Sequence, residues 1–309
     1  MANLTMLDVV RMTGGDDVVP LIEESVQVHP ELMLGATRTI TGTGFNSLVR
    51  TALPSVGFRN LNEGVTAVKS TYALRRSECF LVDASSECDK AMVDQTEDGA
   101  DAIIAMEASA MLESAMRSVA SQFYYGTATT VETSIAASPT KGFPGLVETY
   151  DSTNMEVDAG GGGTSRSSVW LIKWGPQYVQ WLMGRNGEIA TSETMEVRLT
   201  DGSSNPYDGY RKPLTFYVGL HNANPRNSSV RIKNLTAANP LTDTLMFDAL
   251  QLFPAGISPD VALMSRRSLY QLRASRTATN PTGLPAPIPG DVAGIPIAVT
   301  DAILDTENA

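Results

Sequence analysis

The sequence predicts an α+β fold, and three segments carry that prediction. Residues 94–123 place apolar side chains at helical spacing over roughly 45 Å, at a rise of about 1.5 Å per residue. Residues 36–85 contain broken, β-branched runs typical of a long two-stranded excursion. Residues 191–235 contain three strand-like runs separated by turn signals, as in a meander. A long helix combined with hairpin-like strands indicates an α+β fold.

The composition bounds the class of protein. The chain has 309 residues, of which 42% are hydrophobic and 18% are charged, so it can bury a sizeable core in one large or two smaller domains. Its net charge of −11 argues against a general nucleic-acid clamp, because such a clamp needs a basic stripe to displace counterions from phosphates. An acidic protein surface that faces DNA and repels it weakly is compatible with this charge.

Neither a membrane span nor a secretory signal is expected. No apolar run is long enough to cross a bilayer, and the start, MANLTMLDVVRMTGGDD, lacks a basic region followed by an apolar block. Cys79 and Cys88 are the only cysteines, and their spacing matches no zinc motif. Both are therefore expected to be reduced and inert.

The first elements look like an arm followed by an extended loop. Residues 7–12 and 18–26 are predicted as short amphipathic helices, which need a surface to lie on because they are marginal alone. The stretch RTALPSVGFRNLNEGVTAVKSTY, residues 50–72, mixes many apolar side chains with breakers. Residues 69–85 are predicted as one longer strand, with Tyr72 and Leu74 on the same face.

The long helix is the clearest element of the chain. Asp94 and Glu97 form a predicted N-cap pair, and the length suits a spine rather than a helix of a compact domain. The apolar side chains that share its inner face are Ala100, Ile103, Ile104, Ala108, Met111, Leu112, Ala115, Val119 and Phe123.

The rest of the chain alternates strands, helices and loops. In order, the sequence predicts a loop-rich stretch with four consecutive glycines (126–168), a buried strand (168–175), a short helix (177–184), the meander, a helix stopped by Pro254 (242–254), a short strand (260–265), a helix capped by Ser265 (266–275), an ordered loop (277–294) and a final strand (295–304).

The sequence contains few groups that could perform chemistry. His29 and His221 are the only histidines; they are predicted to lie far apart, in the arm and in a turn. The glycine tract lacks the lysine of a phosphate-binding loop. Trp170, Trp174 and Trp181 favour core packing over a ligand pocket. An acidic cluster leaves a metal-dependent enzyme open as an alternative to a solvated run before a helix: Asp83, Glu87, Asp89 and Asp94. This profile indicates a structural or assembly protein.

Seven segments, in order, resemble a tailed-phage major capsid protein with the Hong Kong 97-type fold, which is shared with encapsulins. They include KGFPGLVETYDS and SVWLIKWGPQ. Their ranges are 21–64, 89–126, 141–152, 168–177, 217–235, 264–276 and 294–304. No single motif is specific, and the resemblance rests on the order of the set over nearly the whole chain.

The resemblance implies a domain plan and a function. The plan is an N-terminal arm (1–35), an extended loop (36–85), a peripheral domain with the spine helix (86–142) and an axial domain with some peripheral strands (143–309). The implied function is self-assembly into an icosahedral shell around double-stranded DNA. The alternative is an encapsulin-like compartment that encloses a cargo enzyme. Neither implies a catalytic, cofactor or metal site.

The resemblance also implies partners. These are other copies in pentamers and hexamers, a portal protein, a cement or decoration protein, and packaged DNA through non-specific proximity, with no membrane. The chain starts directly at the arm, so a separate scaffolding protein is expected. It also stops soon after Thr300, so the peripheral sheet is expected to draw strands from the loop and arm region or to have a rearranged topology. The virion is the implied location, with assembly in the host cytoplasm.

The extended loop supplies the candidate intersubunit contacts. An apolar loop without its own core can offset its ordering entropy by burial against neighbouring copies, and arginines suit contacts with carboxylates. In an isolated chain, Phe58, Leu61 and Val65 should therefore be exposed. The Lys–Asn cross-link of one family variant is not carried over to Lys69. The candidate contacts are Arg50, Phe58, Arg59, Leu61, Glu63, Val65, Lys69, Tyr72, Arg75 and Arg76.

Overall fold

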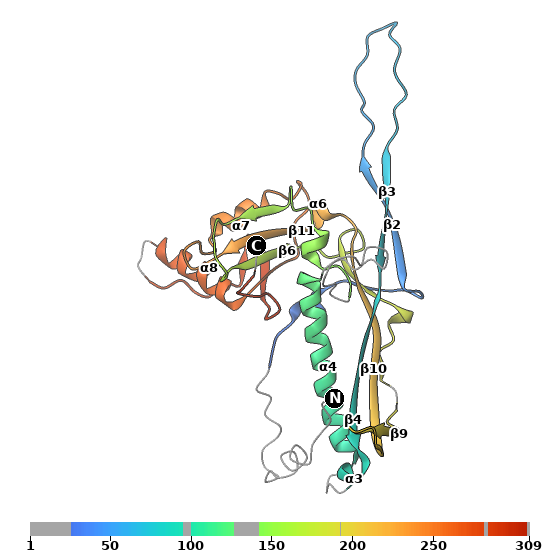
Figure 1. Cartoon of the computed structure of the whole chain (residues 1–309). Coiled ribbons are helices and arrows are strands. Elements are labelled where there is room, and N and C mark those ends of the chain that lie inside the picture. The colour runs from blue at the N-terminus through green and yellow to red at the C-terminus, as the bar shows by residue number, and fades with distance from the viewer. Residues whose placement is uncertain (1–25, 95–99, 127–141, 192, 281–283, 308–309) are drawn as a thin grey trace.

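The computed structural model describes residues 26–94, 100–126, 142–191, 193–280 and 284–307 (Figure 1). Both predicted arm helices lie outside these ranges, apart from Val26, which is exposed and not helical. The helices are α2 (Pro30–Leu34), α3 (Lys90–Val93), α4 (Ala100–Tyr125), α5 (Leu146–Thr149), α6 (Pro225–Ser228), α7 (Asp243–Leu250) and α8 (Arg266–Ala278), with a 3₁₀ turn η1 (Arg185–Gly187).

One sheet runs beside the long helix. Its order is β1 (Thr37–Thr39), β7 (Val179–Met183), β10 (Pro206–Asn222) and β4 (Phe80–Asp89), while β8 (Ala190–Thr191) and β9 (Met195–Thr200) also pair with β10. β1 is parallel to β7, and the other pairs are antiparallel. The prediction of a short helix at 177–184 was wrong. This segment is β7, because pairing on both edges with β1 and β10 outweighs its weak local preference.

A second sheet forms the other lobe. Its order is β13 (Asp291–Val292), β14 (Ile295–Val299), β12 (Val261–Met264), β6 (Ser167–Ile172), β11 (Ser229–Leu235) and β5 (Glu156–Asp158). The prediction that residues 191–235 form a three-strand meander was wrong for the third strand, which belongs to this second sheet. β9 and β10 form the predicted hairpin, but β11 follows α6 and joins β6 in the second sheet.

Every residue of β6 is buried because both faces of this strand are covered. Val169 and Leu171 pack in the core that includes Met246 and Leu272 of α7 and α8. Trp170 and Ile172, on the opposite face, pack in the core that includes the end of α4. The period-two alternation of a strand thus explains why the predicted buried strand is apolar without interruption.

A two-stranded hairpin projects from the body (Figure 1). It pairs β2 (Gly44–Ala52) with β3 (Thr71–Glu78), and residues 53–70, here named the tip, connect them. The predicted excursion is present, but the predicted strand at 69–85 is two strands, β3 and β4, in different sheets. They separate at Cys79, whose amide donates to the Thr43 carbonyl over 2.7 Å. A Cβ at Gly219 of β10 would lie 2.4 Å from the Glu78 carbonyl oxygen, so glycine permits this close approach.

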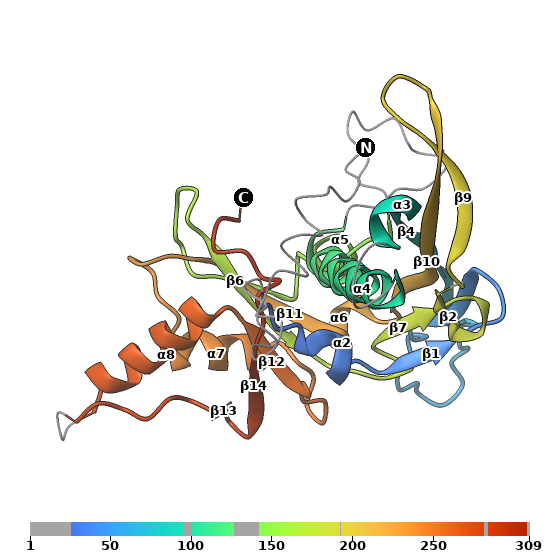
Figure 2. The same cartoon turned by 90° about the horizontal axis from the view of Figure 1, so that it is seen from below.

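α4 is the predicted spine; it runs alongside β4 and β10 (Figure 1) and is seen nearly end-on in Figure 2. It continues to Tyr125, and most of its predicted inner face is buried or partly buried, although Leu112 is 37% exposed. Of the predicted N-cap pair, Asp94 ends α3, and Glu97 lies outside the described residues. Within the described ranges, no helix is both long enough and apolar enough to cross a membrane.

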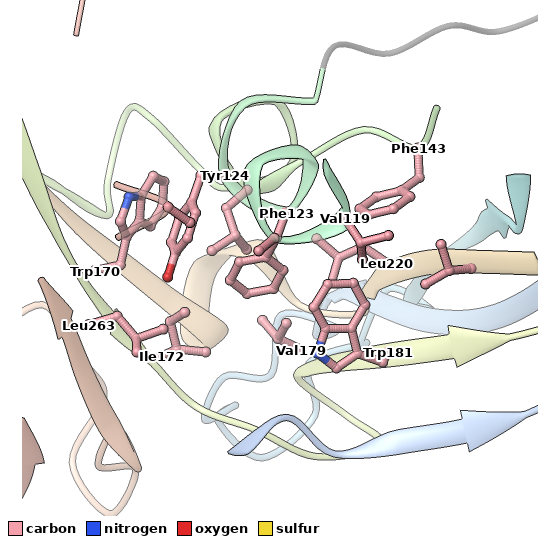
Figure 3. Close-up of a cluster of buried hydrophobic side chains, with 14 of the residues drawn as sticks. Val119, Phe123, Tyr124, Phe143, Trp170, Ile172, Val179, Trp181, Leu220 and Leu263 are labelled. Atoms are coloured by element: carbon pink, nitrogen blue, oxygen red, sulfur yellow. The ribbon is translucent and has the colours of Figure 1, made fainter. Parts of the chain in front are cut away.

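The C-terminal end of α4 joins the two sheets (Figure 3). Phe123 and Tyr124 are fully buried, and the Phe123 ring centroid lies 5.0 Å from that of Trp181 on β7. The Tyr124 ring centroid lies 6.4 Å from that of Trp170 on β6. The tryptophans therefore serve the core, as predicted. The predicted helices at α7 and α8, the Ser265 cap and the strands β12 and β14 are also present.

Candidate intersubunit surface

The tip exposes large apolar side chains. Phe58 is 110% exposed relative to the reference state, Leu61 is 92% exposed and Val65 is 72% exposed. The predicted exposure is confirmed, and these side chains gain little hydrophobic stabilisation within their own subunit. An exposed apolar cluster of this kind is typical of an interaction surface.

The stem of the hairpin extends this surface. Leu48 pairs with Leu74 across the strands, and Arg50 pairs with Tyr72 two residues further along, which places all four on one face. Leu48 is 70% exposed and Leu74 is 68% exposed. Neither was among the predicted contact residues. Their period-two spacing relative to Arg50 and Tyr72 is the signal that could have identified them.

Two of the predicted contact residues stabilise the tip itself. The Asn60 amide donates to Glu63 Oε2 over 3.1 Å and its Nδ2 donates to Oε1 over 3.3 Å, while the Arg59 guanidinium donates to the Glu63 carbonyl over 2.5 Å. The hydrogen bonds from Asn60 hold the pKa of the Glu63 carboxyl below its ordinary value. Asn62 adopts a φ of 70°, a conformation that asparagine tolerates better than most residues.

The hairpin carries a charge opposite to that of the whole chain. Between Gly44 and Glu78 the sequence has five cationic and two acidic side chains, which gives a net +3 in a chain of net −11. Arg76 pairs with Glu78 at 2.7 Å, whereas Lys69 is exposed. The cations are Arg50, Arg59, Lys69, Arg75 and Arg76. Such a hairpin complements an acidic surface, including that of another copy.

The root of the hairpin is fixed to the body through His221. This residue is fully buried in β10, rather than in the turn where the sequence predicted it, and its Nδ1 lies 2.9 Å from Ser77 Oγ of β3. The Phe45 ring of β2 packs edge-on against the imidazole at 4.9 Å, and the Arg38 guanidinium lies 4.5 Å from the Phe45 ring centroid. Burial, reinforced by Arg75 and Arg38, lowers the pKa of His221 to about 4.

The depressed pKa of His221 predicts acid sensitivity of the subunit. A neutral His221 contributes its full stability above its ordinary pKa of 6.5, and the contribution is lost as pH falls towards 4. We expect a loss of about 3 kcal/mol over this range. Urea unfolding at several pH values should show this loss in the wild type and a shallower dependence in His221→Gln. Equal slopes in both proteins would contradict the prediction.

The predicted acidic cluster does not form one site. The structure gives each carboxylate its own partner. Asp83 accepts a hydrogen bond from the Thr215 hydroxyl, and Asp94 accepts one from the Tyr210 hydroxyl. Glu87 Oε1 lies 3.6 Å from Arg211 Nε, and Asp89 caps α3. Among the described residues, no group of three or more His, Cys, Asp or Glu side chains could hold a metal ion. Cys79 and Cys88 are buried free thiols, and burial raises the pKa of both.

Comparison with known proteins identifies the family. The sequence matches the family model described as Major capsid protein GP7 over residues 21–309. The chain belongs to this family of major capsid proteins. It is thus a virion protein of tailed phages, with a structural role. No curated protein matches the sequence.

The similarity to solved structures concerns the fold. The capsid protein superposes on a chain of bacteriophage Epsilon15 with a TM-score of 0.72 at 20% identity, covering 100% of this chain and 98% of that one. This match shows that the mixed helix and sheet fold is Hong Kong 97-like. Two other matches are to the capsid of Myoviridae phage XM1 (TM-score 0.49, 12% identity, 70% and 95% covered) and to the SrpI encapsulin of Synechococcus elongatus PCC 7942 (0.47, 8%, 75% and 96%).

Proposed function

We propose that this capsid protein assembles, without enzymatic activity, into an icosahedral shell that encloses the double-stranded DNA of a tailed phage. Other copies, in pentamers and hexamers, are its principal partners. The observation that supports this assembly role is the projecting hairpin, whose exposed tip presents Phe58, Leu61 and Val65 on a member of a capsid family.

The energetics of the hairpin favour contact with neighbouring copies. Ordering extended backbone costs about 1–2 kcal/mol per residue, and the tip has no core of its own to offset that cost. Burial of its apolar side chains against another subunit supplies the missing stabilisation, as in folding coupled to association. In a closed shell every copy both gives and receives such a contact, so modest contacts act together.

The domain plan and the remaining partners follow the same proposal. The arm is residues 1–35, the extended loop 36–85, the peripheral domain 86–142, and the axial domain with some peripheral strands 143–309. A scaffolding protein, a portal protein and a cement or decoration protein join the shell, which forms in the host cytoplasm. The acidic balance of the chain favours weak, sequence-independent contact with packaged DNA.

Electron microscopy of the purified protein, produced alone and together with its scaffolding protein, tests the proposal. We expect closed icosahedral particles, and particles purified from a phage lysate should contain double-stranded DNA. Particles that hold a cargo enzyme and no DNA would support the encapsulin-like alternative instead. Only monomers or small oligomers under all conditions would contradict both.

A further inference from the structure

The apex of the tip contains a hydrogen-bonded turn. The Glu63 amide donates to the Asn60 carbonyl over 3.4 Å, which closes a β-turn over residues 60–63. Asn62, the third residue of this turn, has a φ of 70°, whereas Leu61 before it does not have a positive φ. A positive φ at the third position alone is the geometry of a type II turn, where asparagine can stand in place of glycine. The tip is therefore not uniformly irregular.

The Glu63 side chain fastens this turn from within. Its Oε2 accepts from the Asn60 amide over 3.1 Å, and its Oε1 accepts from Asn60 Nδ2 over 3.3 Å. The Arg59 guanidinium donates to the Glu63 carbonyl over 2.5 Å and closes the same unit from its other end. The hydrogen bonds that the structure shows within residues 53–70 all lie between Arg59 and Glu63. Residues 59–63, here named the apex turn, are thus the ordered unit of the tip.

The apex turn presents the two most exposed large apolar side chains of the described chain. Leu61 occupies the second position, at the corner of the turn, and Phe58 directly precedes Arg59. An anchor side chain that is already held in one place binds at a lower entropic cost than one on a freely moving loop. The turn therefore prepares these two side chains for a contact.

The charges of the hairpin assign the Glu63 carboxylate to the turn rather than to a partner. A hairpin of net +3 complements an acidic surface, and such a surface repels a carboxylate. Both acidic side chains of the hairpin are engaged inside it. Glu63 accepts from Asn60, and Glu78 lies 2.7 Å from Arg76. A negative charge at the apex is thus explained by the amide donors that it holds.

We propose that Glu63 is a positioning residue for assembly, which keeps the apex turn formed in the free subunit so that Phe58 and Leu61 meet the neighbouring copy as a preorganised pair. This inference rests on the proposed contact between the tip and another copy, and it adds how that contact is prepared. The rest of the tip orders on association, but the apex turn does not have to. Fewer residues are then fixed at the moment of contact, so shells form at a lower protein concentration.

Two pairs of variants separate the turn from direct contacts with a partner. Asn62→Val places a β-branched side chain at a positive φ and should open the turn, whereas Asn62→Gly loses the same amide side chain and permits the turn. Glu63→Ala removes the acceptor of the Asn60 amide, whereas Glu63→Gln removes the charge but keeps an oxygen that can accept this bond. Each turn-breaking variant is thus matched by a variant that also lacks the native side chain.

The first measurement is the protein concentration at which shells begin to form, under conditions in which the wild type assembles. Asn62→Val and Glu63→Ala should raise this threshold by about 5- to 30-fold, the effect of having to fix about one further residue. Asn62→Gly and Glu63→Gln should stay within about threefold of the wild type. The double variant Asn62→Val/Glu63→Ala should lose no more than either single variant, because both break the same turn.

Two further measurements separate the turn from the fold of the subunit. Hydrogen–deuterium exchange of residues 58–64 in the unassembled full chain reports the turn directly. We expect slower exchange in the wild type, Asn62→Gly and Glu63→Gln than in Asn62→Val and Glu63→Ala. The melting temperature should be the same in all five proteins, because the tip contributes no side chain to either large core.

Three results would overturn the inference. Equal exchange in the wild type and Glu63→Ala would show that the turn is not formed before docking. An equal rise of the threshold in Glu63→Gln and Glu63→Ala, larger at low salt, would assign Glu63 to an ion pair with the partner. Equal thresholds for Asn62→Val and Asn62→Gly would show that the geometry of the turn does not matter. In each case wild-type shells would still form, whereas their absence would instead contradict the proposed function.

Discussion

Replacing both Phe58 and Leu61 with aspartate is expected to prevent closed shells from forming while leaving the subunit folded. Both side chains are more than 90% exposed, so the free energy of unfolding should change by less than about 0.5 kcal/mol. In an assembled shell the same positions would bury carboxylates. Loss of one anchor side chain at an interface typically costs about 2 kcal/mol or more, which is about a 30-fold loss of affinity at each contact.

Sedimentation velocity and electron microscopy would measure assembly, and circular dichroism melting would report the fold. Ile189→Asp is the matched control, because Ile189 is an exposed apolar residue outside the hairpin, with 41% of its surface accessible. Shells should persist in this control. Normal shells from the Phe58 and Leu61 variant would contradict the assignment of the tip as a contact surface. Loss of shells in the control as well would point to a general effect of added charge.

The hairpin could be predicted from the sequence because structure-breaking residues and apolar residues occur together in one segment. Breakers such as Pro54 and Gly57 exclude a regular element, and apolar neighbours such as Phe58 exclude a simple solvent loop. Together they indicate an extended segment that needs an external surface. α4 was predictable for a related reason, since a buried helical face repeats at a fixed spacing along the chain.

Strand partners could not be predicted in the same way, because pairing depends on residues far apart in the sequence. Nothing local separates β3 from β4 at Cys79. The division arises where β10 pairs with β4 from Gly209↔Asp89 to Val218↔Phe80, and the hairpin departs beyond that point. The local sequence of β7 favours a short helix, but β1 and β10 pair with its two edges and make it a strand. In these segments tertiary pairing decides the local structure.

The burial of Glu31 was also beyond local inference. His29 and Glu31 are two residues apart, and nothing in their spacing indicates burial. The hydroxyl that binds Glu31 comes from Thr300, 269 residues later in the chain. A buried polar contact of this kind becomes visible only when the fold has brought the start and the end of the described chain together.

Glu307→Ala is expected to lower the free energy of unfolding by about 3–5 kcal/mol, because it leaves a buried cation without its partner. The Glu307 side chain is 4% exposed and lies 2.9 Å from the Arg231 guanidinium, which is itself 12% exposed. Glu307 Oε1 also accepts from the Tyr125 hydroxyl over 2.5 Å and from Ser168 Oγ over 2.6 Å. One carboxylate thus connects α4, β6 and β11.

Urea unfolding with an unchanged m value would measure this loss. Glu196→Ala is the matched control, because Glu196 pairs with Lys90 at 2.5 Å but is 64% exposed, and such pairs contribute at most about 1 kcal/mol. A similar cost for both variants would contradict a structural role for the buried pair. Replacing both partners, as in Arg231→Met/Glu307→Leu, removes the unpaired charge and should recover much of the lost stability. Recovery in this double variant but not in Glu307→Leu alone would show that the cost of Glu307→Ala comes from an Arg231 left without its carboxylate rather than from lost packing.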